Sequence, residues 1–181
     1  MNRQTAKQII LITGGARSGK SLYAETRAAA LGSRRIYVAT AEAGDDEMAQ
    51  RIAAHRKRRG DAWTTVEEPM RLAETLLAWR GRTDCAVVDC LTLWLSNLLF
   101  RDEQDIQEKI EALTLTLPCL DFSVALVTNE VGAGIVPDNR LARQFRDLAG
   151  YANQRLAAVA NEVVLMVAGI PMIVKKDGRC S

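Results

Sequence analysis

Short apolar runs rich in β-branched residues alternate along the chain with longer amphipathic stretches. This rhythm is typical of a mostly parallel sheet covered by helices, because strands buried on both faces are apolar throughout, whereas surface helices are apolar on one side only. The apolar runs predict strands at Gln8–Thr13, Arg35–Thr40, Ala62–Glu67, Cys85–Asp89, Ser123–Thr128 and Val163–Ala168, with Ile173–Lys175 as a final edge strand. The amphipathic stretches predict helices at Lys20–Ala30, Asp46–Arg59, Met70–Trp79, Leu91–Phe100, Asp105–Leu115 and Asn139–Glu162, the last open to a break near Gly150.

The composition is that of a folded α/β protein. The 181 residues carry a net charge of +2 at pH 7, and 48% of them are hydrophobic, which excludes intrinsic disorder and favours one domain over residues 1–181. So small a charge does not imply a nucleic-acid partner. The N-terminus is too polar for a signal peptide, and the apolar run Val163–Val174 is too short for a membrane span and is interrupted by Gly169 and Pro171. We therefore expect a cytoplasmic protein without membrane insertion, in which this run forms buried strand.

A phosphate-binding motif follows the first predicted strand. In GGARSGKS, Gly14, Gly19, Lys20 and Ser21 satisfy the P-loop pattern in its strand-to-helix context. Glycines let backbone N–H groups curl around phosphate oxygens, and the next helix presents its positive N-terminal end to the anion. The pattern predicts that Lys20 contacts the β- and γ-phosphates and that the Ser21 hydroxyl binds Mg²⁺. The alternative, a glycine-rich turn that only caps a helix, requires all four residues to coincide by chance.

Asp89 is the candidate carboxylate on the metal side of the nucleotide. It closes the apolar run Cys85–Asp89, and P-loop enzymes place such an acid at the end of a second buried strand. Asp89 also fits an N-cap of the helix predicted to start near Leu91, and both roles are compatible. The chain lacks the NKxD sequence by which small GTPases read guanine, so a small-molecule kinase or nucleotidyltransferase is favoured over a regulatory GTPase.

The single histidine, His55, lies in DDEMAQRIAAHRKRR, where acids at the start and bases at the end match a helix macrodipole. Met48, Ile52 and His55 share one helix face, so a packed or surface histidine is the simplest interpretation. The basic residues Arg56–Arg59 favour a second interpretation, in which His55 is a nucleophile. Positive charge nearby disfavours the imidazolium form and so leaves a nucleophilic nitrogen free. The same charges would hold a triphosphate, although a solvated helix end would show the same run.

These segments together resemble the adenosylcobinamide kinase/adenosylcobinamide-phosphate guanylyltransferase family of cobalamin biosynthesis. The resemblance runs nearly end to end and is carried by TGGARSGKS, ATAEAGDDEMAQRIAAHRKRR, VVDCLTLWLSNLLF and VTNEVGAGIVPDNRLARQFRDLAGYANQRLA. The last segment is the most discriminating, since P-loops are widespread. Asp138, where the family more often has Glu, and the short polar tail KKDGRCS are the main departures, and neither touches the proposed chemistry.

The resemblance implies a RecA-like P-loop fold and a bifunctional enzyme. It implies phosphorylation of the aminopropanol hydroxyl of adenosylcobinamide, followed by transfer of GMP from GTP to that phosphate, with pyrophosphate released. His55 occupies the position of the family's GMP-carrying histidine, with Lys20 as the second catalytic residue. GTP, with ATP as another phosphate donor, and Mg²⁺ are the expected cofactors, and Ser21 and Asp89 the expected metal ligands. The implied nucleotide contacts are Gly14, Gly15, Ala16, Arg17, Ser18, Gly19, Lys20, Ser21, Ala39, Thr40, Ala41, Arg56, Lys57, Arg58, Arg59, Glu67 and Asp89.

Three further expectations concern specificity and partners. The carboxylate of Glu67 can accept from the N1–H and N2–H₂ edge of guanine, although an exposed strand-end acid would look the same. Asn129, Glu130 and Arg140 belong to a Gly- and Asn-rich segment after a strand, where we expect contacts to adenosylcobinamide and its phosphate. The family's propeller-like homotrimer is expected here, with helix Leu91–Phe100 equally suited to an interface or to the core. The rival interpretations are a kinase alone, with His55 structural, and a nucleotide-binding module without group transfer.

Overall fold

A computed structural model describes residues 7–44, 46–101, 105–177 and 179–180. Its strands are β1 (Ile9–Gly14), β2 (Arg35–Ala39), β3 (Thr64–Glu67), β4 (Cys85–Asp89), β5 (Ser123–Val127), β6 (Glu162–Val167), β7 (Ile170–Lys176) and β8 (Arg179–Cys180). Within these residues they form one sheet in the order β3-β2-β4-β5-β1-β6-β7-β8. The first six strands of that order pair in parallel, and β7 and β8 are antiparallel additions at one edge.

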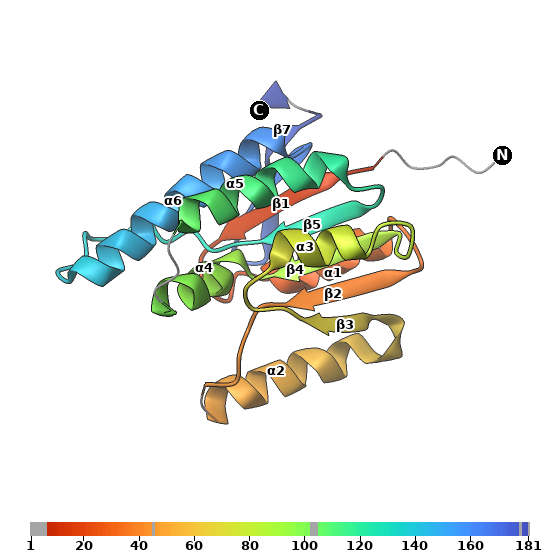
Figure 1. Cartoon of the computed structure of the whole chain (residues 1–181), viewed down its shortest axis with the longest axis horizontal. Helices are drawn as coiled ribbons and strands as arrows, with labels where there is room; N and C mark the ends of the chain where they lie inside the picture. The colour runs from red at the N-terminus through yellow and green to blue at the C-terminus, as the bar shows by residue number, and fades with distance from the viewer. Residues whose placement is uncertain (1–6, 45, 102–104, 178, 181) are drawn as a thin grey trace.

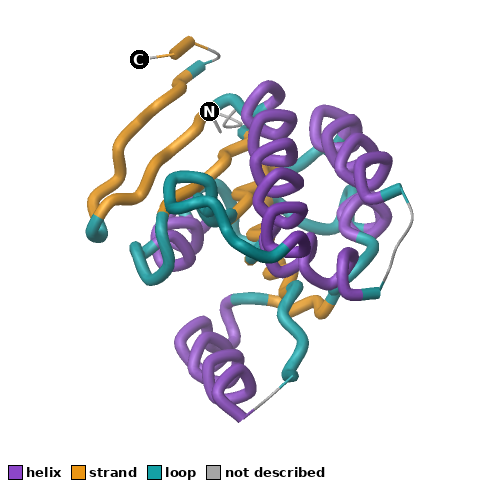
Figure 2. Tube along the Cα trace, turned by 90° about the vertical axis from the view of Figure 1, so that its left-hand side faces the viewer, coloured by secondary structure: helices purple, strands orange, loops and turns teal. Residues whose placement is uncertain are grey.

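Helices cover both faces of this sheet (Figure 1). They are α1 (Lys20–Ala29), α2 (Asp46–Arg59), α3 (Leu72–Ala78), α4 (Leu91–Phe100), α5 (Ile106–Thr116) and α6 (Arg140–Val159). Helices α3 to α6 form a layer on one face, and α1 packs on the other against β4 and β5. Helix α2 lies apart from that layer in both views (Figures 1 and 2), and Figure 1 shows it beyond β3. No helix in the described ranges is both long and apolar enough to cross a membrane.

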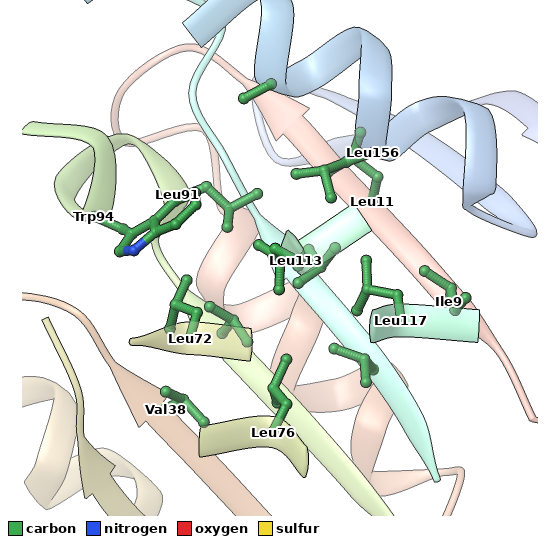
Figure 3. Close-up of a cluster of buried hydrophobic side chains, with 14 of the residues drawn as sticks. Ile9, Leu11, Val38, Leu72, Leu76, Leu91, Trp94, Leu113, Leu117 and Leu156 are labelled. Carbon is green, nitrogen blue, oxygen red and sulfur yellow. The ribbon is translucent and has the colours of Figure 1, made fainter. Parts of the chain in front are cut away.

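Alternate residues of each central strand enter different cores, which explains the continuous apolar runs. Ile9 and Leu11 of β1 pack under α3 to α6, whereas Ile10 and Ile12 pack toward α1. The first core also contains Trp94 and Leu113, which lie between the helices and the sheet in Figure 3. Helix α4 contributes Leu91, Trp94, Leu95 and Leu98 to this core, and at its end Phe100 is 74% exposed. This helix was expected to form either an interface or part of the core, and most of its apolar side chains lie in the core.

The prediction that the apolar run Val163–Val174 forms buried strand is wrong for the second half of the run. The chain turns back at Ala168 and Gly169, which both have positive φ (50° and 84°), as a two-residue hairpin requires. β6 is largely buried beside β1, but β7 is exposed along its length and pairs antiparallel with β6. The predicted edge strand Ile173–Lys175 is therefore the second half of a longer strand.

Most other predicted elements are confirmed, with differences at their ends. The last helix runs unbroken through Gly150 and ends at Val159, because Glu162 already belongs to β6. Its start is capped by the Asn139 side chain, which accepts from the Ala142 N–H at 2.7 Å. The strand predicted from Ala62 begins at Thr64, because Gly60–Ala62 forms a 3₁₀ turn.

Candidate functional site

The phosphate-binding loop connects β1 to α1 at the carboxyl edge of the sheet, and its backbone requires glycine. Gly14 has φ +139°, and a Cβ atom there would lie 2.4 Å from the Met166 carbonyl oxygen of the neighbouring β6. Gly19, at the N-cap of α1, has φ +93°. Both positions exclude larger residues, so the loop curls tightly enough for N–H groups to converge on an anion.

Lys20 lies at the first position of α1 and is only 6% exposed. Its ammonium donates to the carbonyl oxygens of Gly14 (2.9 Å) and Gly15 (2.6 Å). These contacts hold the charge within the loop, over the positive end of α1. Ser21 follows, half-buried like Ser18, and the other loop residues Gly15, Ala16, Arg17 and Gly19 are exposed. The sequence prediction of a P-loop between strand and helix is confirmed in its geometry.

Asp89 ends β4, and β5 lies between β4 and β1. Two strand spacings of about 4.8 Å separate the ends of β1 and β4 by about 10 Å, so Asp89 and the loop that leads to Ser21 start from the same edge of the sheet. One oxygen of the carboxylate, Oδ2, accepts from the Tyr37 hydroxyl at 2.5 Å. Burial and, after it, the charge and hydrogen bond of Asp89 raise the pKa of Tyr37, so the phenol stays protonated and remains the donor.

The donor set of Ser21 and Asp89 fits Mg²⁺ brought by a nucleotide rather than a preformed metal centre. Hydroxyl and carboxylate oxygens are the ligands Mg²⁺ prefers, and the ion is usually held by one or two carboxylates plus substrate phosphates. In the described part of the chain, no group of three His, Cys, Asp or Glu residues is arranged to bind a metal.

Thr40 forms a buried clamp behind Asp89. Its hydroxyl donates to the Cys90 carbonyl and accepts from the Cys90 N–H, each at 2.8 Å, and its own carbonyl accepts from the Asn97 amide at 2.8 Å. Thr40 has no exposed surface. Residues 39–41 were expected to contact the nucleotide. Ala39 and Ala41 face the pocket that contains His55, whereas the Thr40 side chain is enclosed between them.

His55 lines a pocket between α2 and the carboxyl ends of β2 and β4. The pocket encloses about 480 Å³, counting its open mouth. Its lining residues are Tyr37, Ala39, Ala41, Met48, Ile52, His55, Arg59, Asp89, Cys90 and Leu93. The predicted face of α2 is thus turned toward the sheet, and it places the imidazole and Asp89 on the walls of one pocket. Pockets with mostly apolar walls and a few convergent polar groups are typical ligand sites.

The basic end of α2 is tied to the rest of the site through two of its four cations. Arg58 donates to Glu25 of α1 at 2.7 Å, a hydrogen bond that is the largest cause of a raised pKa of Arg58. Glu25 is one helical turn after Ser21, so this ion pair brings the end of α2 next to the start of α1. Arg59 is 8% exposed and its guanidinium lies 3.6 Å from the ring centroid of Tyr37. Arg56 and Lys57 are exposed.

The remaining predicted residues lie outside this pocket. Glu67 is exposed at the end of β3. Asn129 donates to the Thr92 hydroxyl at 2.7 Å, and the Glu130 carboxylate accepts from the Gly132 N–H at 2.8 Å, so both are engaged within the protein. The Glu130 N–H donates to Gly14, which places this loop beside the phosphate-binding loop. Arg140, at the start of α6, is exposed.

Sequence reasoning missed Tyr37 and Glu25. Both are buried polar residues on elements that carry site residues, and nothing in their local sequence marks them. Their partners, Asp89 and Arg58, are 52 and 33 positions away in the chain. Only the strand register and the packing of α2 bring these pairs together.

The phosphate-binding loop, the strand order and Asp89 define a P-loop nucleotide-binding enzyme. A family model described as cobinamide kinase/cobinamide phosphate guanyltransferase matches residues 10–174. The chain belongs to this family, and it has the family's kinase and guanylyltransferase activities in cobalamin biosynthesis.

Curated relatives are similar in sequence to this chain along nearly its whole length. The bifunctional adenosylcobalamin biosynthesis protein CobP of Pseudomonas aeruginosa is 49% identical over 168 residues, covering 92% of this chain and 97% of the relative. CobU of Escherichia coli is 45% identical and that of Salmonella typhimurium 43%, each over 92% of this chain and 99% of the relative. The flagellar accessory protein FlaH from Methanocaldococcus jannaschii shares the fold alone, with a TM-score of 0.53 at 12% identity over 94% of this chain and 79% of FlaH.

Proposed function

We propose that the phosphate-binding loop and the His55 pocket form one catalytic centre that serves both reactions in turn. The observation that carries this proposal is the position of α2, whose inner face lines a pocket with Asp89 while Arg58 bonds to Glu25, one turn from Ser21. A nucleotide with its phosphates on the loop can then extend toward His55. Residues 1–181 act together as a single domain in this proposal, supported by the one sheet that joins the elements of the site.

In the kinase reaction, the aminopropanol hydroxyl of adenosylcobinamide attacks the γ-phosphorus of a nucleoside triphosphate. The new O–P bond replaces the bond to the β-phosphate oxygen, the nucleoside diphosphate leaves, and the hydroxyl proton is lost to solvent. The loop N–H groups and Lys20 offset the charge on the transferring phosphoryl group. Either GTP or ATP fits this step, because the loop contacts phosphates and not the base.

In the guanylyl reaction, a neutral imidazole nitrogen of His55 attacks the α-phosphorus of GTP. An N–P bond forms, the bond to the β-phosphate oxygen breaks, and pyrophosphate leaves. A phosphate oxygen of adenosylcobinamide phosphate then attacks the same phosphorus, which releases His55 and gives adenosylcobinamide-GDP. The apolar walls of the pocket suit a purine ring, and Arg59 beside His55 supplies positive charge near the reacting phosphate.

Mg²⁺ would be held by Ser21 and Asp89 together with the nucleotide phosphates, and when bound it would neutralise phosphate charge. Positive charge around the triphosphate is proposed to come from Arg56, Lys57 and Arg58. Arg58 supplies this charge without breaking its ion pair with Glu25. Gly14, Gly15, Ala16, Arg17, Ser18, Gly19 and Lys20 are proposed to surround its phosphates, and Ala39 and Ala41, which line the pocket, to contact its nucleoside, with Thr40 enclosed behind them. Such reactions use cytoplasmic nucleotides, which favours the cytoplasm as the site of action.

Glu67 is proposed to read the guanine base. It ends β3, its side chain is exposed, and a carboxylate accepts from the N1–H and N2–H₂ groups that adenine lacks. Glu67→Gln should therefore reduce the preference for GTP over ATP in guanylyl transfer by about tenfold, the effect of one lost charged hydrogen bond. The measurement is kcat/KM for each nucleotide, with Glu74→Gln on α3 as a matched control. An unchanged GTP preference would remove Glu67 from base recognition.

The corrinoid is proposed to bind where the loop after β5 meets the phosphate-binding loop. The bond from the Glu130 N–H to the Gly14 carbonyl supports this placement, since it sets the loop beside the expected γ-phosphate. Ile135 and Val136 of the same loop are 97% and 58% exposed, which offers apolar contact surface to a macrocycle. Asn129, Glu130 and Arg140 flank this surface in the sequence and are proposed to make polar contacts to the corrinoid.

A homotrimer is proposed from the family resemblance and from the exposed face of β7. Ile170, Met172 and Val174 alternate along this edge strand and are 66%, 52% and 44% exposed. Light scattering should give three times the chain mass of 19.9 kDa for the wild type. Met172→Glu should shift that mass toward the monomer, whereas Leu115→Glu on α5, at a site 70% exposed, should not. A monomeric wild type would contradict the trimer.

The overall proposal is tested by product analysis with adenosylcobinamide. Incubation with ATP alone should give only adenosylcobinamide phosphate, and later addition of GTP should convert it to adenosylcobinamide-GDP with one pyrophosphate released per product. Phosphorylation without any GDP product would favour a kinase acting alone. A nucleotide-binding module would form neither product.

A further inference from the structure

Tyr37 is a buried residue of the nucleotide site that the sequence motifs did not assign to either reaction. It lies on β2 and is 3% exposed. Its side chain lines the pocket that contains His55, and its hydroxyl donates to Asp89 Oδ2 at 2.5 Å. Tyr37 therefore contacts both halves of the proposed catalytic centre.

The contact with Asp89 follows from the strand register. Tyr37 pairs with Val87, and Ala39 pairs with Asp89, so Tyr37 and Asp89 are diagonal neighbours on one face of the sheet. An aromatic side chain spans that diagonal, and hydrogen bonds to an ionised group are the strong ones. Because the bond occupies Oδ2, it fixes the carboxylate orientation and leaves Oδ1 available to the metal side of the nucleotide.

The ring of Tyr37 makes a separate contact with α2. The Arg59 guanidinium lies 3.6 Å from the ring centroid, close enough for a desolvated cation–π interaction. Trp63 packs edge-on against the same ring, with centroids 6.2 Å apart. Arg59 is four residues after His55, so the two side chains share one face of the helix. Holding Arg59 therefore also holds the helical turn that presents His55.

We propose that Tyr37 is a positioning residue with two separable roles: its hydroxyl orients Asp89 for Mg²⁺ binding, and its ring fixes Arg59 and the His55 turn of α2. This inference rests on the proposed function of Asp89 and His55. The two roles reside in different parts of one side chain, so different substitutions separate them.

Tyr37→Phe removes the hydroxyl and keeps the ring. Loss of a residue that orients a metal ligand typically weakens metal affinity by about tenfold to a hundredfold. We expect a shift of that size in the affinity for Mn²⁺ in the presence of GDP, followed by electron paramagnetic resonance, a readout that does not depend on turnover. We also expect the Mg²⁺ concentration for half-maximal kinase rate to rise, and the rate of GMP attachment to His55 at saturating Mg²⁺ to fall less than it does when the ring is removed as well.

Tyr37→Leu removes the ring as well. It should weaken Mn²⁺ binding as Tyr37→Phe does and, in addition, slow GMP attachment at saturating Mg²⁺ by about tenfold, because the His55 turn loses its support. Thermal unfolding shows whether this variant is folded. If it is not, Tyr37→Met, whose unbranched and flexible side chain reaches further into the space left by the ring, takes its place.

Tyr151→Phe is the matched control, because the Tyr151 hydroxyl donates to the Glu111 carboxylate at 2.6 Å between α5 and α6, away from the site. It should leave Mn²⁺ affinity unchanged. An Mn²⁺ affinity of Tyr37→Phe within twofold of wild type would overturn the hydroxyl role, and equal GMP attachment rates in Tyr37→Phe and Tyr37→Leu would overturn the ring role. A wild type that makes neither product would instead contradict the proposed function.

Discussion

Replacing Lys20 with alanine should abolish most of the kinase activity, with kcat reduced by about a thousandfold. Lys20 is the buried cation of the phosphate-binding loop, and its ammonium is held by the Gly14 and Gly15 carbonyls within the loop. Charge on the transferring phosphoryl group grows in the transition state, so loss of this cation should reduce kcat more than it raises KM for the nucleotide. Steady-state kinetics with adenosylcobinamide and ATP measure both constants.

Lys20→Met separates the charge from the packing, because methionine keeps an unbranched stem of similar length. Both variants should lose activity equally, while Lys20→Met should unfold closer to the wild-type temperature. Activity retained by Lys20→Met would mean that the side chain acts through packing, and it would contradict the assigned role.

Replacing His55 with alanine should abolish guanylyl transfer and leave the kinase reaction within a fewfold of wild type. His55 is the proposed nucleophile, and removal of a nucleophile from a catalytic unit costs at least about 10⁴-fold. The proposed kinase step does not use this imidazole, because in that proposal the phosphates lie on the loop between β1 and α1 and the acceptor is a hydroxyl. Separate assays of adenosylcobinamide phosphate and adenosylcobinamide-GDP distinguish the two activities.

His55→Gln is the companion variant, since glutamine occupies a similar volume in the pocket and lacks a nucleophilic nitrogen. It should behave like His55→Ala. Guanylyl transfer by either variant near the wild-type rate would make His55 a packed residue of α2, which is the simplest interpretation of a lone histidine. Loss of both activities in folded variants would instead indicate that α2 supports the kinase reaction as well.

The parallel core of the fold was predictable because its strands are buried on both faces. β1, β4 and β5 read as continuous apolar runs for that reason, and the motif between β1 and α1 requires a strand before it and a helix after it. The edge was harder to predict. β7 is as apolar as a buried strand, and its turn, Ala168–Gly169, lacks the Asn-Gly or Asp-Gly signal of most two-residue hairpins.

The linear motifs of the site were predictable, but its cross-connections were not. Lys20, Ser21 and Asp89 follow from spacing and from position at strand ends. The ion pair of Arg58 with Glu25 and the contacts of Tyr37 with Asp89 and Arg59 depend on register and on where α2 packs. Sequence alone presents Arg58 and Arg59 as part of a basic run that either holds a triphosphate or forms a solvated helix end, and it does not predict that Arg59 is buried and Arg58 paired with Glu25.

Intact-protein mass spectrometry after incubation with GTP and Mg²⁺ tests the shared catalytic centre most directly. The wild type should gain the mass of one GMP unit, located on His55 by peptide mapping, and should lose it on addition of adenosylcobinamide phosphate. Lys20→Ala should form the adduct slowly and His55→Ala not at all. A folded wild type that makes adenosylcobinamide-GDP without any adduct on His55 would contradict the account.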